Sequence, residues 1–229
     1  MEILIGLADR VERAMLARLH AALPAARREK ADAYLRPQDR DTSILSFALL
    51  QLLWEQRHGT PMPDVQLGRY GKPAFADGNG MHFSLSHDGT VCACVSAPVP
   101  VGIDVQSRVG FDGGLFERIA SERERSLRDV LRRADDLSSL WTRKEALVKR
   151  TGRGLTVPLP SVEGGAAPDV VTFSCGAPDF RMSLSAEGMT RAAIASRVRV
   201  RFAHPAHVGW RFAPGADLLQ PMAEFAVAA

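Results

Sequence analysis

Three segments carry the side chains best suited to chemistry, and the first is VGIDVQ at residues 101–106. Its alternating apolar residues predict a strand that places Gly102, Asp104 and Gln106 on one face. Two oxygen-bearing side chains spaced i, i+2 can converge on a hard cation, and Mg²⁺ typically takes one or two protein carboxylates plus substrate phosphates. Gly102 would leave room for a ligand to approach closely. The alternative is that Asp104 is an ordinary turn or capping residue at a strand end.

The second segment, LWTRKEALVKRTGRGL at residues 140–155, predicts a helix. At about 100° per residue, its buried stripe consists of Leu140, Leu147 and Val148. Glu145 and Lys149 lie one turn apart at the edge of that stripe, where a helix can flank a cleft. Gly152 is placed to end the helix in a left-handed conformation. The alternative is that Glu145 and Lys149 form an ordinary exposed ion pair.

The third set consists of two neighbouring stretches, YGKPAF at residues 70–75 and FSLSHD at residues 83–88. Pro73 favours an extended conformation at Lys72, which would present the lysine ammonium from a turn. At the end of the second stretch, Ser86 and His87 could offer a hydroxyl and an imidazole to a phosphate. The alternative is that His87 is a structural residue paired with backbone groups.

An α+β framework of short strands and a few longer helices must position these segments. Strands are expected at residues 1–8, 65–67, 81–86, 90–96, 101–106, 170–174, 180–185, 192–202 and 208–212. Helices are expected at residues 11–20, 27–35, 111–133 and 137–150, with a buried central helix that Asp39 or Asp41 caps and that Gly59 closes after about Arg57. Strands follow helices in each half, which indicates α+β halves of similar plan.

The charge balance suits a polyanionic ligand or an acidic partner protein. The net charge is only +3, far from the dense basic patches of nucleic-acid-binding proteins. A nucleic-acid-binding module built on the arginine-rich stretch 118–133 is a distant alternative, because acidic residues are interleaved along it. Four of the 29 basic residues are lysines, which leaves 25 arginines, so a lysine retained in this background can be one that its site requires.

The sequence also indicates a cytoplasmic protein. Cys92, Cys94 and Cys175 show no CxxC spacing, and their odd number argues against a disulfide framework. The N-terminus lacks the basic region of a secretory signal, and the most apolar run, Ile44–Trp54, is too short to span a bilayer. We therefore expect no membrane association.

Together, the three sets of residues resemble the Sfp-type 4′-phosphopantetheinyl transferases. That family carries a Lys-Pro element and a Ser-His pair, then G-[IV]-D-[IV]-E, then W-x-x-K-E-x-x-x-K with a glycine-rich tail. The chain has them in that order, at Lys72-Pro73 with Ser86-His87, at residues 102–106 and at residues 141–149. The resemblance covers roughly residues 24–160. Independent surface features would not fall in this order and spacing, so the resemblance favours the functional interpretations.

The resemblance implies a fold of two similar α/β halves, residues 1–104 and 105–229, with coenzyme A in the cleft between them. The implied reaction transfers 4′-phosphopantetheine from coenzyme A to a serine of an apo acyl or peptidyl carrier protein, with Mg²⁺, and releases adenosine 3′,5′-bisphosphate. Its implied catalytic residues are Asp104, Glu145 and Lys149, and its metal ligands are Asp104, Gln106 and Glu145. Its implied coenzyme A contacts are Lys30, Arg40, Lys72, Pro73, Ser86, His87, Lys144 and Lys149. Two fused halves would make a monomer sufficient.

The chain also departs from the family pattern. Gln106 stands where the family usually has a glutamate ligand, so we expect weaker metal binding, and a non-catalytic carrier-binding paralogue is the main alternative. Asp88 follows Ser-His where a second serine is common, and Thr42 stands where a basic residue is frequent. The sequence beyond Gly165 matches poorly and gives no carrier-docking surface.

Overall fold

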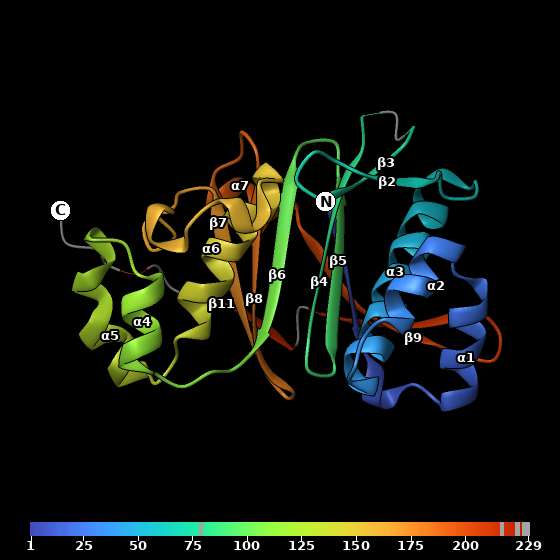
Figure 1. Ribbon diagram of the computed structural model, residues 1–229, viewed down its shortest axis with the longest axis horizontal. Helices are drawn as coiled ribbons and strands as arrows, with labels where there is room; N and C mark the ends of the chain where they lie inside the picture. Colours follow the sequence, from blue (N-terminus) through green and yellow to red (C-terminus); the bar gives the residue numbers. More distant parts are fainter. Residues whose placement is uncertain (78–79, 216–217, 223–224, 226–229) are drawn as a thin grey trace.

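The computed structural model describes residues 1–77, 80–215, 218–222 and 225. It is an α+β fold in which two sheets lie side by side (Figure 1). The first sheet has the order β10-β9-β1-β5-β4, formed by Trp210–Pro214, Arg199–Pro205, Glu2–Leu7, Val91–Ala97 and His82–Asp88. The second has the order β11-β7-β8-β6, formed by Leu219–Pro221, Val170–Gly176, Asp179–Ala186 and Val101–Ser107. A small hairpin joins β2 (Val65–Leu67) to β3 (Pro73–Phe75).

Helices cover the outer faces of these sheets. The helices are α1 (Arg13–Ala22), α2 (Ala25–Asp32), α3 (Pro37–His58), α4 (Gly113–Ile119), α5 (Arg128–Ala134), α6 (Ser138–Thr151) and α7 (Arg191–Arg197). Short 3₁₀ turns occur at Ala8–Arg10, Arg123–Leu127, Gly154–Thr156 and Leu159–Ser161. In Figure 1, α1–α3 lie on the side of the first sheet, and α4–α6 lie on the side of the second. None of the helices in the described ranges has the length and apolarity needed to cross a bilayer.

The main hydrophobic core lies between the two sheets. Alternate residues of β1, such as Ile3 and Ile5, are fully buried there together with Ile103 of β6 and Leu184 of β8. The intervening Leu4 points to the opposite face of β1, where it joins a second cluster under α3. Because the strands are buried on both faces, small displacements of α3 or α6 would disturb the core.

The two sheets meet along β4 and β6, where side-chain oxygens of β4 accept hydrogen bonds from the backbone of β6. Ser84 Oγ accepts from Ile103 N at 3.1 Å and Ser86 Oγ accepts from Val105 N at 3.1 Å. Asp88 Oδ2 accepts from Ser107 N at 2.8 Å, which gives the aspartate after the Ser-His pair a structural role. These alternate residues of β4 therefore join the sheets by a row of side-chain contacts.

Gly102 allows α6 to pack directly on β6. An added Cβ would overlap Ala146 O and Arg150 N, both backbone atoms of α6. The expectation that Gly102 leaves room for a ligand is therefore corrected: the space beside it is filled by the helix. This close approach fixes the height of α6 above the face of β6 that carries Asp104.

Several predicted elements differ in the structure. The helix expected at 111–133 is divided into α4, a 3₁₀ turn and α5, and the Asp112 side chain caps α4 by accepting from Leu115 N at 2.6 Å. The first part of the strand expected at 192–202 is α7, capped by Thr190, whose Oγ1 accepts from Ala193 N at 3.3 Å. Helix α3 begins at Pro37, without an Asp39 or Asp41 cap, and Gly59 closes it in the left-handed region at φ 66°, as predicted.

The strand pairing also differs from a simple division of the chain. The expected boundary between residues 104 and 105 falls inside β6, which is one continuous strand of the second sheet. In addition, β9 and β10 return to the first sheet, with β9 parallel to β1. The first sheet therefore combines strands from both ends of the chain, whereas all strands of the second sheet lie within residues 101–221.

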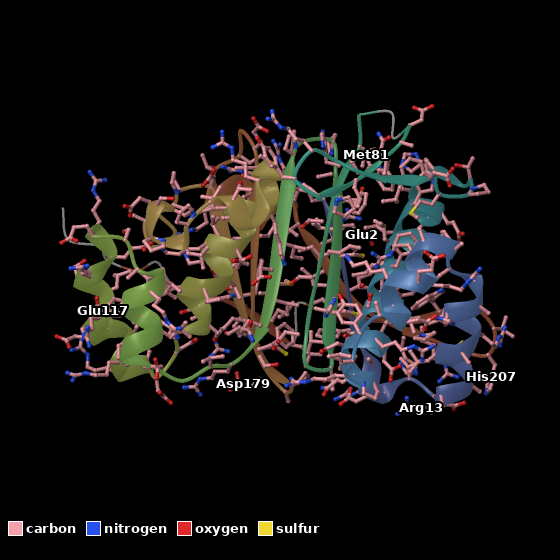
Figure 2. All side chains as sticks on the ribbon, in the orientation of Figure 1. Glu2, Arg13, Met81, Glu117, Asp179 and His207 are labelled. Atoms are coloured by element: carbon pink, nitrogen blue, oxygen red, sulfur yellow. The ribbon has the colours of Figure 1, made fainter. Side chains whose placement is uncertain are left out.

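The surface formed by α4, the following 3₁₀ turn and α5 carries paired charges. Arg128 forms an ion pair with Glu117, which is labelled in Figure 2. Along the same surface, Arg125 pairs with Glu122 at 3.4 Å and Arg132 pairs with Asp129 at 3.1 Å. These neighbouring carboxylates reduce the positive potential of the arginine-rich stretch.

Candidate functional site at the junction of the sheets

The Asp104 carboxylate lies at the centre of the candidate site, on the face of β6 that α6 covers. It is only 5% exposed. Its Oδ1 accepts from Ser86 Oγ at 2.8 Å and from Lys149 Nζ at 2.6 Å. Its Oδ2 is buried with no hydrogen-bond partner among the described residues. Burial raises the pKa of Asp104, against the opposing effect of Lys149 and Ser86.

Helix α6, which covers this face of β6, places Glu145 and Lys149 near the Asp104 carboxylate. Lys149 donates to Ser86 Oγ at 2.9 Å as well as to Asp104, so it joins α6 to both β4 and β6. Burial raises the pKa of Glu145, and the charge of nearby Asp104 raises it further. The surface ion-pair interpretation is therefore wrong for Lys149, since its partner is the buried Asp104.

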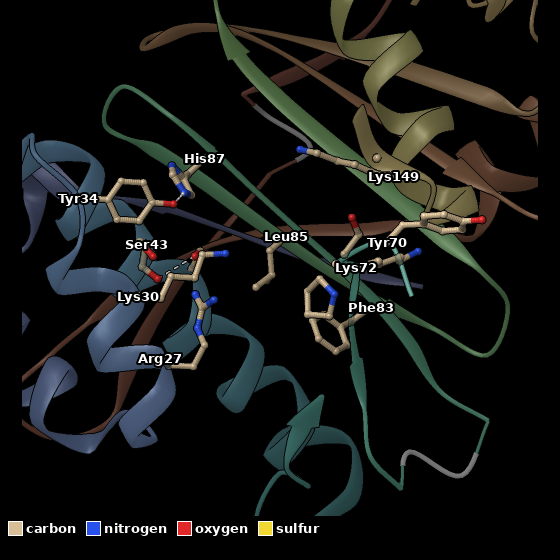
Figure 3. A pocket seen from close by; sticks show the side chains of 16 residues that line it. Arg27, Lys30, Tyr34, Ser43, Tyr70, Lys72, Phe83, Leu85, His87 and Lys149 are labelled. Atoms are coloured by element: carbon tan, nitrogen blue, oxygen red, sulfur yellow. Dashed lines mark hydrogen bonds between the residues drawn. The ribbon is translucent and has the colours of Figure 1, made fainter. Parts of the chain in front are cut away.

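A pocket of about 240 Å³ adjoins these residues (Figure 3). Its lining comes from α2, α3 and β4 on one side and from the end of α6 with the loop before β3 on the other. The predicted site residues that line it are Lys30, Lys72, Pro73, His87 and Lys149. Its lining includes no aspartate or glutamate, so the pocket is electrostatically suited to an anion.

Arg27 is a pocket residue that sequence reasoning missed. It lies one turn before Lys30 on α2, and Figure 3 shows both side chains reaching the same end of the pocket. Its guanidinium stacks over the Phe47 ring at 4.7 Å, and its Nε is buried without a hydrogen-bond partner among the described residues. Burial lowers the pKa of Lys30, and Arg27 lowers it further. The i, i+3 spacing of two cations on a short helix was the available signal.

His87 and Ser86 point in different directions because neighbouring residues of a strand face opposite sides. The His87 imidazole lines the pocket, with Tyr34 Oη 3.2 Å from Nε2 and Thr42 Oγ1 3.4 Å from Nδ1. Burial lowers the pKa of His87, and Lys149 lowers it further. Ser86 instead faces Asp104, so the two side chains lie on opposite faces of β4.

Lys72 lines the pocket with its stem and places its ammonium at the end of α6. Its Nζ donates to Val101 O and Arg150 O, each at 3.0 Å. Burial lowers the pKa of Lys72 to about 8, with a smaller effect from Arg150. Gly152 ends α6 at φ 73°, as predicted, and an added Cβ there would lie 3.1 Å from Lys72 Cδ.

Two further predicted contacts lie away from the pocket. Arg40 Nε donates to Asp32 Oδ1 at 2.9 Å on the outer surface. Lys144 is completely buried, with its Nζ 2.5 Å from Glu124 Oε2. The same ammonium donates to the carbonyls of Ile119, Leu159 and Val162 at 2.6, 3.0 and 2.8 Å. The assignment of Lys144 to coenzyme A binding is therefore corrected: its position in the motif reflects packing of the surrounding loops.

Gln106 lies two residues after Asp104 on the same face of β6. It is half-buried and lies opposite Arg181 of β8. Among the residues that the structure describes, no group of three His, Cys, Asp or Glu side chains is arranged to hold a metal. Gln106, as an amide, adds no negative charge to the face of β6 that carries Asp104.

Comparison with known proteins agrees with this arrangement. The model of the 4′-phosphopantetheinyl transferase superfamily matches residues 100–178, which contain β6 and α6 with Asp104, Glu145 and Lys149. The relatives include 4′-phosphopantetheinyl transferase ffp of Bacillus subtilis, 28% identical over 151 residues, which are 63% of this chain and 66% of the relative. Over residues 100–178, the chain is therefore similar to the 4′-phosphopantetheinyl transferase superfamily.

Two more relatives support the Sfp-type resemblance. The 4′-phosphopantetheinyl transferase Sfp of Bacillus subtilis (strain 168) is 28% identical over 140 residues, 59% of this chain and 62% of that protein. The 4′-phosphopantetheinyl transferase AcpT of Salmonella typhi is 34% identical over 106 residues, 41% of this chain and 52% of that protein. The matched segments span slightly less than two thirds of the relatives ffp and Sfp. Within the superfamily match, the structure therefore accounts for the G-I-D and W-x-x-K-E segments as one packed β6–α6 unit.

Proposed function

We propose that the chain is an enzyme that transfers 4′-phosphopantetheine from coenzyme A to a serine of an apo acyl or peptidyl carrier protein. Adenosine 3′,5′-bisphosphate is the second product. One observation carries the proposal: a pocket lined by basic groups and by no carboxylate adjoins the buried Asp104, whose Oδ2 has no partner among the described residues. The names of the relatives give the chemical identity of the reaction.

The pocket residues provide two separate attachments for the phosphates of coenzyme A. Arg27, Lys30 and His87 form one basic end. A phosphate there would give a hydrogen-bond acceptor to the buried Arg27 Nε, which has none within the described part of the chain. Lys149 lies at the other end, beside Asp104. Lys72 and Pro73 line the pocket near the end of α6. Ser86 is hydrogen-bonded to both Asp104 and Lys149 and so fixes their relative positions.

The residues present fit a Mg²⁺ ion. Asp104 Oδ2 is a buried oxygen with no hydrogen-bond partner among the described residues, and Glu145 lies close enough that the Asp104 charge raises its pKa. Asp104 and Glu145 would hold the ion, with the Gln106 amide oxygen as a neutral third ligand. A bound Mg²⁺ would neutralise negative charge on the pyrophosphate. Because Gln106 adds no charge, the affinity for the ion would be lower than with a third carboxylate.

The proposed roles of the chain's own residues follow from their positions. Glu145 accepts the proton of the carrier serine hydroxyl as its oxygen attacks the phosphorus, and its raised pKa makes it a stronger base than an ordinary carboxylate. The bond from phosphorus to the pyrophosphate bridging oxygen breaks, and Lys149 donates a hydrogen bond or proton to that departing oxygen. Ser86 and Asp104 keep the Lys149 ammonium directed into the site.

We further propose that the two sheets with their helices form two similar halves and that coenzyme A lies between them. The pocket is lined by α2, α3 and β4 of one side and by α6 of the other, which supports this arrangement. One chain supplies all of these elements, so a monomer would suffice.

Mass spectrometry of an apo carrier protein tests the activity directly. The carrier is incubated with the protein, coenzyme A and Mg²⁺, and it should gain the mass of one phosphopantetheine group. Glu145→Gln and Lys149→Met should each lower the rate strongly, whereas Arg133→Met on the exposed end of α5 serves as a matched control. No mass gain on any carrier of a panel would contradict the enzymatic proposal. Carrier binding without mass gain would instead favour a non-catalytic paralogue. This is the second candidate function, because Gln106 stands where the family usually has a glutamate ligand.

A further inference from the structure

A second cavity of about 480 Å³ lies at the edge of the first sheet and shares no lining residue with the pocket beside Asp104. We call it the β9–β10 groove. It is lined by Ile5, Leu7, Arg10, Ala177, Phe202, Ala203, His204, Arg211, Phe212, Ala213 and Leu218. Its volume falls within the range of about 300–1,000 Å³ that is usual for small-molecule sites.

One end of the groove is apolar and reaches the main core. Strand pairing places Ile5 of β1 opposite Phe202 of β9, and Phe202 opposite Ala213 of β10, so these side chains form one row across three strands. Ile5 is fully buried and belongs to the core between the sheets, against which Phe202 also packs. The floor of the groove is therefore the inter-sheet core itself.

The other end of the groove is basic. His204 and Arg211 are paired with each other, two residues along from Phe202 and Ala213, so they occupy the same face about 7 Å further on. Arg10, in the 3₁₀ turn after β1, also lines this end. Neither Arg10 nor Arg211 has an ion-pair partner among the residues that the structure describes, although Glu12 lines a small adjoining cavity with His204 and Arg211.

We propose that the β9–β10 groove binds the anion of a free, unbranched fatty acid. The carboxylate would lie between Arg211, His204 and Arg10, and the hydrocarbon chain would lie along Phe202 and Ala213, above the buried Ile5. Charge complementarity selects an anionic head group, since the lining contains basic residues and no carboxylate. The apolar row selects a chain without further polar groups, because a buried polar group would have no partner there. This site is independent of the proposed transfer reaction.

Isothermal titration calorimetry with decanoate, kept below its critical micelle concentration, tests the proposal. Decanoate should bind with a stoichiometry of one, whereas decanol, which lacks the charge, and acetate, which lacks the chain, should bind at least about tenfold more weakly. Arg211→Gln should weaken decanoate binding about tenfold, as expected for loss of one charge-assisted hydrogen bond. Arg133→Gln on α5 makes the same chemical change outside the groove and should leave the affinity unchanged.

The outcomes separate the alternatives. Equal affinities for decanoate and decanol, or undiminished binding by Arg211→Gln, would overturn the proposal. Sedimentation with phosphatidylglycerol vesicles that depends on Arg211, without decanoate binding, would overturn it in favour of a membrane surface contact. Because Arg211 is exposed, its replacement should not unfold the chain, and matching thermal unfolding curves of the variants would verify this. The readout is binding alone, so it does not depend on whether transfer activity is found.

Discussion

Replacing Gly102 by alanine provides a direct test of how the site is assembled. The new Cβ would overlap the backbone atoms Ala146 O and Arg150 N and would lie 3.0 Å from Arg150 Cα. These atoms belong to α6 and have no side-chain rotation by which to move away. The helix must therefore shift off β6 as a unit, and it carries Lys149, whose Nζ is now 2.6 Å from Asp104 Oδ1.

The size of the effect follows from the packing. Overpacking a well-packed core costs about 1–3 kcal/mol, and a clash with backbone places Gly102→Ala at the upper end, about 3 kcal/mol. For chains of about 150–250 residues, 1 kcal/mol changes the Tm by about 2–4 °C, so a fall of about 6–12 °C is expected. If the proposed transfer reaction holds, a shift of about 1 Å between α6 and β6 would also lower its rate by about 100-fold.

Thermal unfolding followed by circular dichroism measures the first effect. Gly176 in β7 of the same sheet is the matched control, because an added Cβ there meets no atom within 4 Å. Gly176→Ala should leave the stability within about 1 kcal/mol of the natural chain. If Gly102→Ala and Gly176→Ala unfold at the same temperature, the conclusion that α6 rests directly on Gly102 is wrong.

Three further predictions concern single side chains. Lys144→Arg keeps the positive charge but enlarges a completely buried side chain, so the free energy of unfolding measured in urea should fall by about 1–3 kcal/mol. An unchanged free energy of unfolding would show that this buried position accepts either cationic side chain. Lys72 should titrate near pH 8 in NMR spectra of lysine-labelled protein, and the signal should vanish in Lys72→Met. Since this pKa is lower in the folded than in the unfolded chain, the natural protein should gain stability relative to Lys72→Met as the pH rises from about 8 toward 10.5; a flat difference would contradict the assignment. Gln106→Glu should lower the Mg²⁺ concentration needed for half-maximal transfer, whereas an unchanged requirement would place Gln106 outside the metal shell.

Periodicity located the elements that carry the site but gave incomplete information about their neighbours. Alternation along residues 101–106 correctly put Gly102 and Asp104 on one face. It could not show that this face is covered by a helix, because that contact joins residues more than 40 positions apart. The pairing of β9 with β1 could not be predicted for the same reason. It joins residues 199–202 to residues 2–5, which are far apart in the sequence and show no local pattern that indicates the contact.

Local competition explains the other differences. Residues 191–197 are apolar enough to resemble a strand, yet the Thr190 cap starts a helix there. Ser86 and His87 look like a joint phosphate contact in the sequence, but the strand directs them to opposite sides. Arg27 belongs to no motif and is one of 25 arginines, so only its position one turn before Lys30 on α2 marks it in the sequence.

Three of the four lysines in this arginine-rich chain make hydrogen bonds to several oxygens at once. Lys72 and Lys144 direct their ammonium groups at backbone carbonyls, two for Lys72 and three for Lys144. Lys149 donates to two side-chain oxygens, one of them the buried Asp104 carboxylate. A compact ammonium can direct donors to several oxygens around one point, which a planar guanidinium cannot do in the same space. Donor geometry therefore favours lysine over arginine at these three positions, and only at Lys149 does that geometry belong to the site's proposed chemistry.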